Sequence, residues 1–488
     1  MPDTRSRRKF LQTSAAAALM STRAGAAEAN PAIVRAMDAV RAAIPTAEKD
    51  PTRPVYHFHA PAQWINDPNG TIQYRGWHHM FYQHNPYGAA WGNMHWGHAR
   101  SRDLVNWEHL PIALWPSKEK GEEHVFSGGA ILGPDGRPRV FYTSIGKRDP
   151  EQWMAIPKDD DLITWEKSPA NPILTTKVHK QKIYEWRDPF LFRDGKQTYM
   201  VCGGNIDPRG GYGEVQLYQA KNAELTQWEH RGAMFRNPDR TVWNIECPNF
   251  FRLGSQWVLL TSPQRPCEYF VGDFDPAEPR FTPRRWGVLD PGAAYASNII
   301  FDDQRRCLLL LWSNTRTPEE RGWCGAMVMP RVLIIGEDGH LKQSPAPEFE
   351  KLRTDETVME NVSLNNASVE GRLAAEAMEI GATFDITTAA SVGLEIYGTP
   401  IAFDAGSGWV TVGDEEKIFA GREKTITLRA FLDRRMLEVY ASGCALVHLM
   451  DPGEPGVRIF ARDGAATLRS LRAWRMKPAE SSMAGYRI

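Results

Sequence analysis

The stretch Trp64-Ile65-Asn66-Asp67-Pro68-Asn69-Gly70 decides how the fold of this chain is interpreted. Asp-Pro and Asn-Gly are turn dipeptides, because proline fixes φ and glycine accepts positive φ. An alternating run toward Met80-Phe81-Tyr82 follows, which is typical of a strand. The segment therefore predicts a strand that ends in a tight turn and displays a carboxylate, an amide and an indole. Taken alone, it is also compatible with a plain hairpin loop.

Two later stretches repeat this combination of a carboxylate and a proline. In Glu185-Trp186-Arg187-Asp188-Pro189-Phe190 an arginine precedes the acid and can orient it or balance its charge. The other stretch is Asn244-Ile245-Glu246-Cys247-Pro248-Asn249-Phe250-Phe251. Carboxylates at three proline-marked strand ends indicate that Asp67, Asp188 and Glu246 converge on one pocket. Each acid alone could instead cap a turn or form an ion pair.

An internal repeat predicts the architecture that brings these acids together. The segment Asp103-Leu104-Val105-Asn106-Trp107-Glu108 recurs in related form at residues 161–166 and 224–229. Copies about 60 residues apart suit four-stranded propeller blades, and about 280 residues of short β-rich runs would make five blades. The acidic first residue of each copy can cap a turn, while the leucine and the tryptophan pack on a neighbouring sheet. Asp67, Asp188 and Glu246 would then sit on different blades around a central channel.

Three acids in one funnel repel each other, and burial raises the pKa of the least stabilised carboxyl. Glycoside hydrolysis uses such a site, in which an ionised carboxylate and a protonated acid flank the bond to be cleaved. The motifs themselves resemble the WMNDPNG, RDP and EC motifs of glycoside hydrolase family 32, the β-fructofuranosidases (invertases, inulinases and levanases). Residues 91–98 (WGNMHWGH) and 126–128 (FSG) are similar to the same family's pattern. The resemblance runs from about Tyr56 to the C-terminal end.

The resemblance implies a role for each acid. Asp67 matches the nucleophile, Glu246 the general acid/base and Asp188 the transition-state stabiliser. A retaining mechanism would place the carboxyl groups of Asp67 and Glu246 about 5–5.5 Å apart. Further residues with side chains suited to hydroxyl recognition or stacking are predicted to bind substrate, although a structural role for each stays open: Trp64, Asn66, Gln83, Trp91, Ser127 and Arg187.

Three positions next to these residues need comment. Cys247 could tune the environment of Glu246 or be a plain core thiol. Ile65 stands where the family commonly has methionine, a change at similar volume. Gly129 stands where a second serine is frequent in the family, so its presence could remove a hydroxyl near the substrate.

The composition excludes several classes of partner. With a formal net charge of −1 and a pI near 6.9, no bulk field favours nucleic acid or an anionic membrane. The 6 cysteines show no CxxC spacing, so we expect mostly buried apolar thiols, with one disulfide left open. Histidines cluster from His57 to His98, and His57 and His59 could contact a common ligand. Carboxylate chemistry needs no metal, however, and we expect neither a metal nor another cofactor.

The N-terminal residues 1–30 are predicted to be a twin-arginine signal peptide. Ser6-Arg7-Arg8-Lys9-Phe10-Leu11 carries the arginine pair, an apolar run follows from Thr13 to Met20, and small residues at 24–27 offer a cleavage site. The apolar run is too short to span a bilayer. These features predict a periplasmic or extracellular protein; the alternative is a charged tail on a cytoplasmic one.

At 488 residues the chain is too long for one core. We predict an all-β protein, a five-bladed β-propeller followed by a C-terminal β-sandwich. A short helix or spacer would occupy residues 31–52, with a helical pattern that Pro45 ends. The propeller would occupy 53–340, a crossover linker 341–357 and the sandwich 358–478, where alternating runs such as Leu437-Glu438-Val439-Tyr440 return.

These observations together predict a secreted retaining β-fructosidase that hydrolyses terminal β-D-fructofuranosyl units of sucrose or of fructans such as levan and inulin. The alternatives are a fructosyltransferase or an endo-fructanase on the same scaffold, or a sugar-binding propeller without catalysis. A propeller glycosidase acting on arabinose-containing polymers is disfavoured by the complete block at residues 64–70. The expected partner is the sugar substrate, with no nucleic acid and no membrane after signal removal.

Overall fold

The computed structural model describes residues 30–486 apart from 208, 210, 372, 415 and 452, so the predicted signal peptide, except for its last residue, lies outside the described residues. The one α-helix of this range, α1 (Pro31–Ala47), has Asn30 as its N-cap. Pro45 does not end it as predicted, because the helix continues for two more residues. Within the described range, no helix has both the length and the apolar composition needed to cross a membrane.

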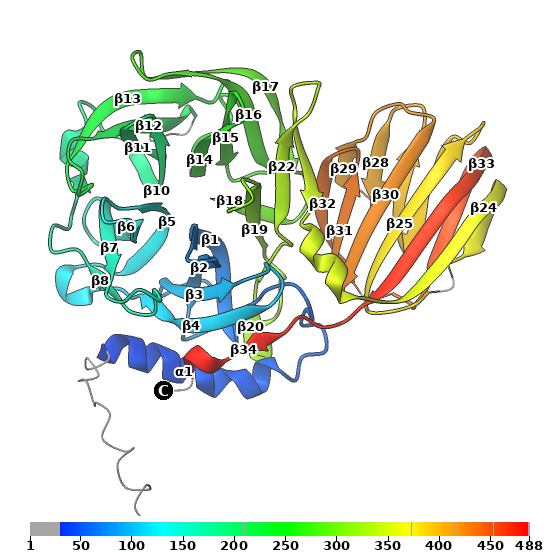
Figure 1. The fold of residues 1–488 in the computed structure, drawn as a ribbon, viewed down its shortest axis with the longest axis horizontal. Helices are drawn as coiled ribbons and strands as arrows, with labels where there is room; N and C mark the ends of the chain where they lie inside the picture. Colours follow the sequence, from blue (N-terminus) through cyan, green and yellow to red (C-terminus); the bar gives the residue numbers. More distant parts are fainter. Residues whose placement is uncertain are drawn as a thin grey trace, which may run out of the picture.

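Five sheets, antiparallel except for the short edge strands β20 and β34, form the predicted β-propeller, and the innermost strands β1, β5, β10, β14 and β18 surround its centre (Figure 1). Blade I contains β1 (Gln63–Tyr74), β2 (Trp77–Asn85), β3 (His95–Ser101) and β4 (Trp107–Leu114), with short β20 (Trp323–Cys324) and β34 (Ser481–Ser482) at its edges. Blade II contains β5 (His124–Leu132), β6 (Pro138–Ile145), β7 (Glu151–Pro157), β8 (Trp165–Lys167) and β9 (Leu174–Thr175). Blade III contains β10 (Tyr184–Asp194), β11 (Gln197–Asn205), β12 (Gly213–Ala220) and β13 (Trp228–Arg236).

Blade IV contains β14 (Glu246–Leu253), β15 (Gln256–Ser262), β16 (Cys267–Asp275) and β17 (Arg280–Asp290). Blade V contains β18 (Ala294–Phe301), β19 (Cys307–Ser313), β21 (Ala326–Met327), β22 (Arg331–Ile335) and β23 (Leu341–Pro345). Short 3-10 helices lie in the connections: η1 (Lys118–Lys120), η2 (Thr176–Val178), η3 (Glu319–Arg321), η4 (Pro347–Leu352) and η5 (Ala484–Tyr486).

The repeated segment is the turn that leads into the outermost strand of blades I to III. In all copies the leucine has a positive φ of 60–63°, and its carbonyl oxygen accepts a hydrogen bond from the tryptophan indole: Leu104 with Trp107, Leu162 with Trp165, and Leu225 with Trp228. The predicted acidic cap is correct for Asp103, whose carboxylate accepts from the next backbone N–H groups. In the other copies the cap stands two residues earlier, at Asp159 and Asn222, because a longer turn precedes the leucine there.

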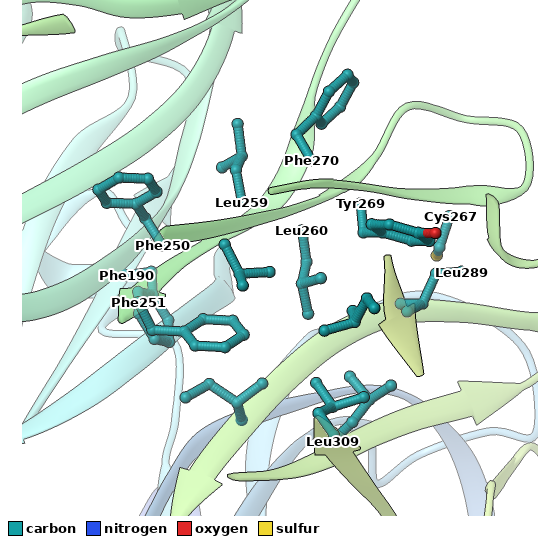
Figure 2. Close-up of a cluster of buried hydrophobic side chains, with 14 of the residues drawn as sticks. Phe190, Phe250, Phe251, Leu259, Leu260, Cys267, Tyr269, Phe270, Leu289 and Leu309 are labelled. Atoms are coloured by element: carbon teal, nitrogen blue, oxygen red, sulfur yellow. The ribbon is translucent and has the colours of Figure 1, made fainter. Parts of the chain in front are cut away.

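Blades stack face to face, so a strand in the middle of a blade is apolar on both faces. In β15 the run Trp257-Val258-Leu259-Leu260 is buried throughout. Figure 2 shows Phe250, Leu259, Leu260 and Phe270 of blade IV beside Phe190 of blade III and Leu309 of blade V. This shared core holds the innermost strands in place, because a close-packed interior leaves little room for a strand to shift.

The C-terminal domain is the predicted β-sandwich. One layer contains β26 (Ser391–Ile396), β27 (Thr399–Asp404), β28 (Trp409–Val412) and β29 (Glu416–Phe419), and the other β25 (Ala377–Ile386), β30 (Thr425–Asp433), β31 (Met436–Ala441) and β32 (Cys444–Leu449). The long strands β24 (Arg353–Glu370) and β33 (Val457–Met476) connect both layers (Figure 1). The first part of β33 pairs with β26 and the second with β25, so the layers form one continuous sheet that folds over its apolar face.

Residues 341–357, which were expected to form a linker between the domains, instead form parts of both domains. Its first residues form β23, which completes blade V, η4 follows, and β24 of the sandwich already begins at Arg353. The chain thus passes between domains within the 3-10 helix. A polar alternating strand such as β23 at the edge of a blade is difficult to distinguish from a linker by sequence pattern alone.

A buried network of charged side chains joins the two domains. His57, just before the propeller, lies 2.9 Å from carboxylate oxygens of both Asp433 and Glu438 in the sandwich. Burial alone would lower the pKa of His57, but its hydrogen bonds to these carboxylates raise that pKa to about 9. Arg331 of blade V is 0% exposed and contacts Asp290 at 2.8 Å and Glu438 at 3.4 Å. The network therefore fixes the sandwich against blades IV and V.

Candidate active site

Each innermost strand slips out of register with its neighbour close to its N-terminal end. The slips lie between Ile65 and Pro68, Val125 and Gly128, Arg187 and Phe190, Glu246 and Asn249, and Tyr295 and Asn298. Such β-bulges interrupt the ladder and re-aim side chains. Proline lacks a backbone N–H, so the prolines after Asp67, Asp188 and Cys247 fit where the ladder is interrupted. The prolines that follow the acidic motifs in the sequence therefore indicate the positions of β-bulges.

The bulges surround a cavity of about 340 Å³ at one end of the channel. Its walls contain all the residues that were predicted as catalytic or substrate-binding: Trp64, Asn66, Asp67, Gln83, Trp91, Ser127, Arg187, Asp188 and Glu246. The three acids come from blades I, III and IV, as the repeat predicts. Phe126, Tyr295 and Trp312 complete the lining.

Asp67 is held by hydrogen bonds to both carboxylate oxygens. The Nδ2 of Asn66 donates to Oδ1 at 2.9 Å, and the hydroxyl of Ser127 donates to Oδ2 at 2.6 Å. The amide of Asn66 is oriented in turn by the indole of Trp64, which donates to its Oδ1 at 2.7 Å. Burial raises the pKa of Asp67, while the bonds from Ser127 and Asn66 oppose this shift by favouring the ionised form.

Glu246 accepts hydrogen bonds from three side chains of three blades. Arg187 donates to Oε1 at 2.5 Å and Gln264 donates to the same oxygen at 2.8 Å. The hydroxyl of Tyr295 lies 2.7 Å from Oε2 and 2.9 Å from the carbonyl oxygen of Ser262. Burial and the nearby Glu246 carboxylate raise the pKa of Tyr295, so its hydroxyl stays protonated and can donate to one of these oxygens at a time.

Asp188 is 5% exposed and lines the same cavity. Its Oδ2 accepts from the backbone N–H of Cys247 at 2.9 Å, and its own N–H donates to the hydroxyl of Thr143 at 2.9 Å. Arg187, expected to balance its charge, is 3.9 Å away and directs its short hydrogen bond to Glu246 instead. Burial raises the pKa of Asp188 to about 7 although Arg187 opposes the shift. Near neutral pH a substantial fraction of Asp188 is therefore protonated.

Cys247 links the acids through its thiol. Its Sγ lies 3.6 Å from Oδ2 of Asp67 and 3.6 Å from Oδ2 of Asp188. Burial raises the pKa of this thiol well above its ordinary range, so the single S–H is kept. The thiol of Cys247 therefore contacts Asp67 and Asp188, whereas an influence on Glu246 stays a prediction. All 6 cysteines lie within the described residues and none is in a disulfide.

Two other expectations are corrected by the structure. Gly129 does not line the cavity: a Cβ at this position would lie 3.1 Å from the carbonyl oxygen of Pro189 in the neighbouring blade, so a hydroxyl there would not face a ligand. His57 and His59 do not share a ligand, because His57 contacts the sandwich and His59 contacts Arg53. Among the described residues, no group of three or more His, Cys, Asp or Glu is arranged to hold a metal ion.

Sequence reasoning missed Tyr295, Trp312 and the wall position of Phe126 as site residues. Tyr295 stands in blade V at the bulge that corresponds to those of the acids, but no proline follows it. The corresponding position in the blade after that of Glu246 could have been located from the repeat spacing, and this would have suggested Tyr295. Trp312 comes from the second strand of blade V and packs edge-on against Trp64. Its buried indole N–H has no hydrogen-bond partner among the described residues.

The five-bladed propeller with a cluster of acids at one end of its channel, joined to a β-sandwich, defines a class of glycoside hydrolases. The chain belongs to glycosyl hydrolases family 32: residues 57–345 match the N-terminal domain of that family and residues 348–475 match its C-terminal domain. The resemblance noted in the motifs is thereby confirmed.

Comparison with individual proteins supports this assignment. A levanase of Bacillus subtilis is 30% identical over 509 residues, covering 89% of this chain and 72% of the levanase. A cell wall β-fructofuranosidase of Pisum sativum is 34% identical over 344 residues, covering 62% of this chain and 61% of that protein, so the match spans about three fifths of the plant relative. The crystal structure of fructan 1-exohydrolase IIa from Cichorium intybus in complex with 1-kestose superposes with a TM-score of 0.79 at 25% identity, covering 88% of this chain and 98% of that chain.

Proposed function

We propose that this protein is an exported β-fructosidase that releases terminal β-D-fructofuranosyl units from sucrose or fructans with retention of configuration. The observation that carries the proposal is the meeting of Asp67, Asp188 and Glu246 in one cavity of about 340 Å³. This volume is at the lower end of the range for small-ligand sites, roughly 300–1,000 Å³, which suits a terminal sugar unit. Relatives named for levan, sucrose 6-phosphate or fructofuranosides agree with the reaction class.

In the proposed first step, Asp67 attacks the anomeric carbon of the fructosyl unit. The bonds from Asn66 and Ser127 hold its carboxylate in one orientation and favour its ionised form. A covalent fructosyl–Asp67 ester then forms as the bond to the leaving oxygen breaks. Asp188 would hold fructose hydroxyls while positive charge develops on the ring.

Glu246 would give a proton to the leaving oxygen and later take one from water. Tyr295 suits this exchange, because its hydroxyl has two acceptors within reach. It can donate to Oε2 when Glu246 is ionised and turn to the carbonyl oxygen of Ser262 when Oε2 carries a proton. Arg187 and Gln264 hold the other oxygen throughout. The second step, attack of water on the ester, restores the free enzyme.

Product analysis tests this function. The purified protein is incubated separately with sucrose, inulin and levan, and we expect free fructose to accumulate from the start of at least one reaction. The Asp67→Ala variant should lose hydrolysis by at least about a thousandfold while it still binds sugar. If early products are oligosaccharides, endo cleavage or transfer replaces the exo mode; if the wild type binds these sugars but converts none, it is a sugar-binding propeller.

Export is a separate proposal that rests on residues 6–27 alone. The arginine pair, apolar run and small residues are those of a twin-arginine signal. A polymeric fructan cannot enter a cell intact, so an enzyme for it would have to work outside the cytoplasm. Fractionation of producing cells tests this point.

A further inference from the structure

A second, much smaller cavity lies among the innermost strands of the propeller. Its volume is about 10 Å³, compared with about 340 Å³ for the active-site cavity, and the two cavities share Ser127 and Asp188 in their walls. All five innermost strands, β1, β5, β10, β14 and β18, contribute residues to its lining. We call this space the channel cavity.

Three side chains of this lining each have a polar atom without a hydrogen-bond partner among the described residues. These atoms are Nδ2 of Asn69, Oδ1 of Asn249 and Oγ of Ser297. The three residues are at most 2% exposed, so bulk solvent does not satisfy them. Buried polar atoms in proteins are nearly always hydrogen-bonded. Three such atoms on the lining of one small cavity therefore indicate a bound ligand.

The orientation of both amides is fixed by the backbone, so the chemical character of each free atom is known. Asn69 accepts at Oδ1 from the backbone N–H of Gly128 at 3.1 Å, which leaves the donor Nδ2 free. Asn249 donates through Nδ2 to the carbonyl oxygens of Cys247 and Ser297, each at 3.1 Å, which leaves the acceptor Oδ1 free. The hydroxyl of Ser297 can both donate and accept.

One donor, one acceptor and one hydroxyl match a water molecule and not an ion. A cation would face the N–H groups of Asn69, whereas hard cations take oxygen ligands. An anion would face the free oxygen of Asn249 and the carboxylate of Asp188. A water molecule accepts from Asn69 and donates to Asn249, and its third bond can go to Ser297, because buried waters typically form about three hydrogen bonds.

The size of the channel cavity supports the same ligand. A single water needs roughly 10–15 Å³ on this measure, so the cavity has room for one water and not for a sugar. The three residues also lie close to the active site along the chain. Asn69 comes two residues after Asp67, Asn249 three after Glu246, and Ser297 two after Tyr295.

We propose that the channel cavity binds one water molecule, which hydrogen-bonds to Asn69, Asn249 and Ser297 and so ties β1, β14 and β18 together beside the three acids. The water is a structural part of the propeller, and its binding does not depend on which sugar the protein cleaves. The inference therefore stands apart from the proposed function, and its tests use no substrate.

A high-resolution crystal structure of the full chain, from a crystal soaked in rubidium bromide, tests the identity of the ligand. We expect one spherical density peak within roughly 2.7–3.2 Å of all three free atoms, without anomalous signal. Featureless density in the channel cavity overturns the inference. An anomalous peak of Rb⁺ or Br⁻ at this position also overturns it, because it would show an ion site.

Urea unfolding of the variant Ser297→Ala tests the bond to the water by the sign of the effect. The Oγ of Ser297 has no partner among the described residues, so alanine removes the proposed bond to the water and no other hydrogen bond. Loss of one ordinary hydrogen bond should raise the equilibrium constant for unfolding about two- to tenfold. A buried hydroxyl that bonds nothing destabilises the fold, so an unchanged or lower constant would overturn the inference.

The matched control is Ser313→Ala. Ser313 is buried in β19 of the same blade, and its hydroxyl also has no partner among the described residues, but it does not line the channel cavity. We expect Ser297→Ala to raise the unfolding constant by more than this control does. An equal rise in both variants would show a general effect of deleting a buried hydroxyl and would also overturn the inference.

Discussion

Replacement of the Asp188 carboxyl should make the protein more stable at neutral pH. In the unfolded chain this group ionises near its ordinary pKa of 3.8, whereas burial raises its pKa in the folded chain to about 7. Between these values the folded state binds more protons than the unfolded state, so the free energy of unfolding falls as the pH rises through this window. Each tenfold change in the ionisation constant is worth 1.36 kcal/mol, so the difference between the two pKa values of Asp188 lowers the free energy of unfolding by about 4 kcal/mol. This loss is complete above pH 7.

Asn at position 188 keeps an oxygen that can accept from the N–H of Cys247 but cannot ionise. We therefore expect Asp188→Asn to raise the free energy of unfolding by up to about 4 kcal/mol at pH 8 and by close to zero at pH 4. Urea unfolding followed by tryptophan fluorescence at several pH values measures this difference. Asp451→Asn is the control, because the Asp451 side chain is 95% exposed and should show no pH-dependent gain. A gain of equal size at pH 4 and pH 8 would refute the reasoning, since it would show that proton binding at Asp188 is not its source.

Two other predictions follow from contacts in the structure, and a third follows from the N-terminal sequence. Tyr295→Phe removes a hydrogen bond to Glu246, the proposed acid/base, so kcat for fructose release should fall about 10–100-fold with KM nearly unchanged. An unchanged kcat would show that Tyr295 takes no part in the reaction. Arg331→Met leaves the buried carboxylate of Asp290 without its cation and should lower the free energy of unfolding by about 3–5 kcal/mol, whereas Arg458→Met at the surface should cost less than about 1 kcal/mol. Similar costs in the two variants would contradict this account of the network. Replacing Arg7 and Arg8 by lysine should leave the protein in the cytoplasmic fraction of a producing cell, and unchanged export would exclude the twin-arginine route.

Local patterns allowed much of the site to be predicted. A proline directly after Asp67, Asp188 or Cys247 marks a point where a strand loses its ladder, and the repeat spacing assigns those points to different blades. The wider lining was harder to predict. Tyr295 has no proline mark, and Trp312 reaches the cavity from the second strand of its blade, a position that depends on packing between blades V and I.

The sequence by itself determined the five-bladed propeller, the sandwich and the identity of the acids, because strand alternation, turn residues and bulge-marking prolines act over a few neighbouring residues. Only the tertiary structure decided which side chain each charged residue of the site pairs with. Arg187 lies next to Asp188 in the chain, yet it donates a hydrogen bond to Glu246 of the following blade and not to Asp188, and burial raises the pKa of Asp188 to about 7. The physical reason is that pKa values and ion pairs depend on burial and on distances between separate blades, and these are established only when the propeller closes.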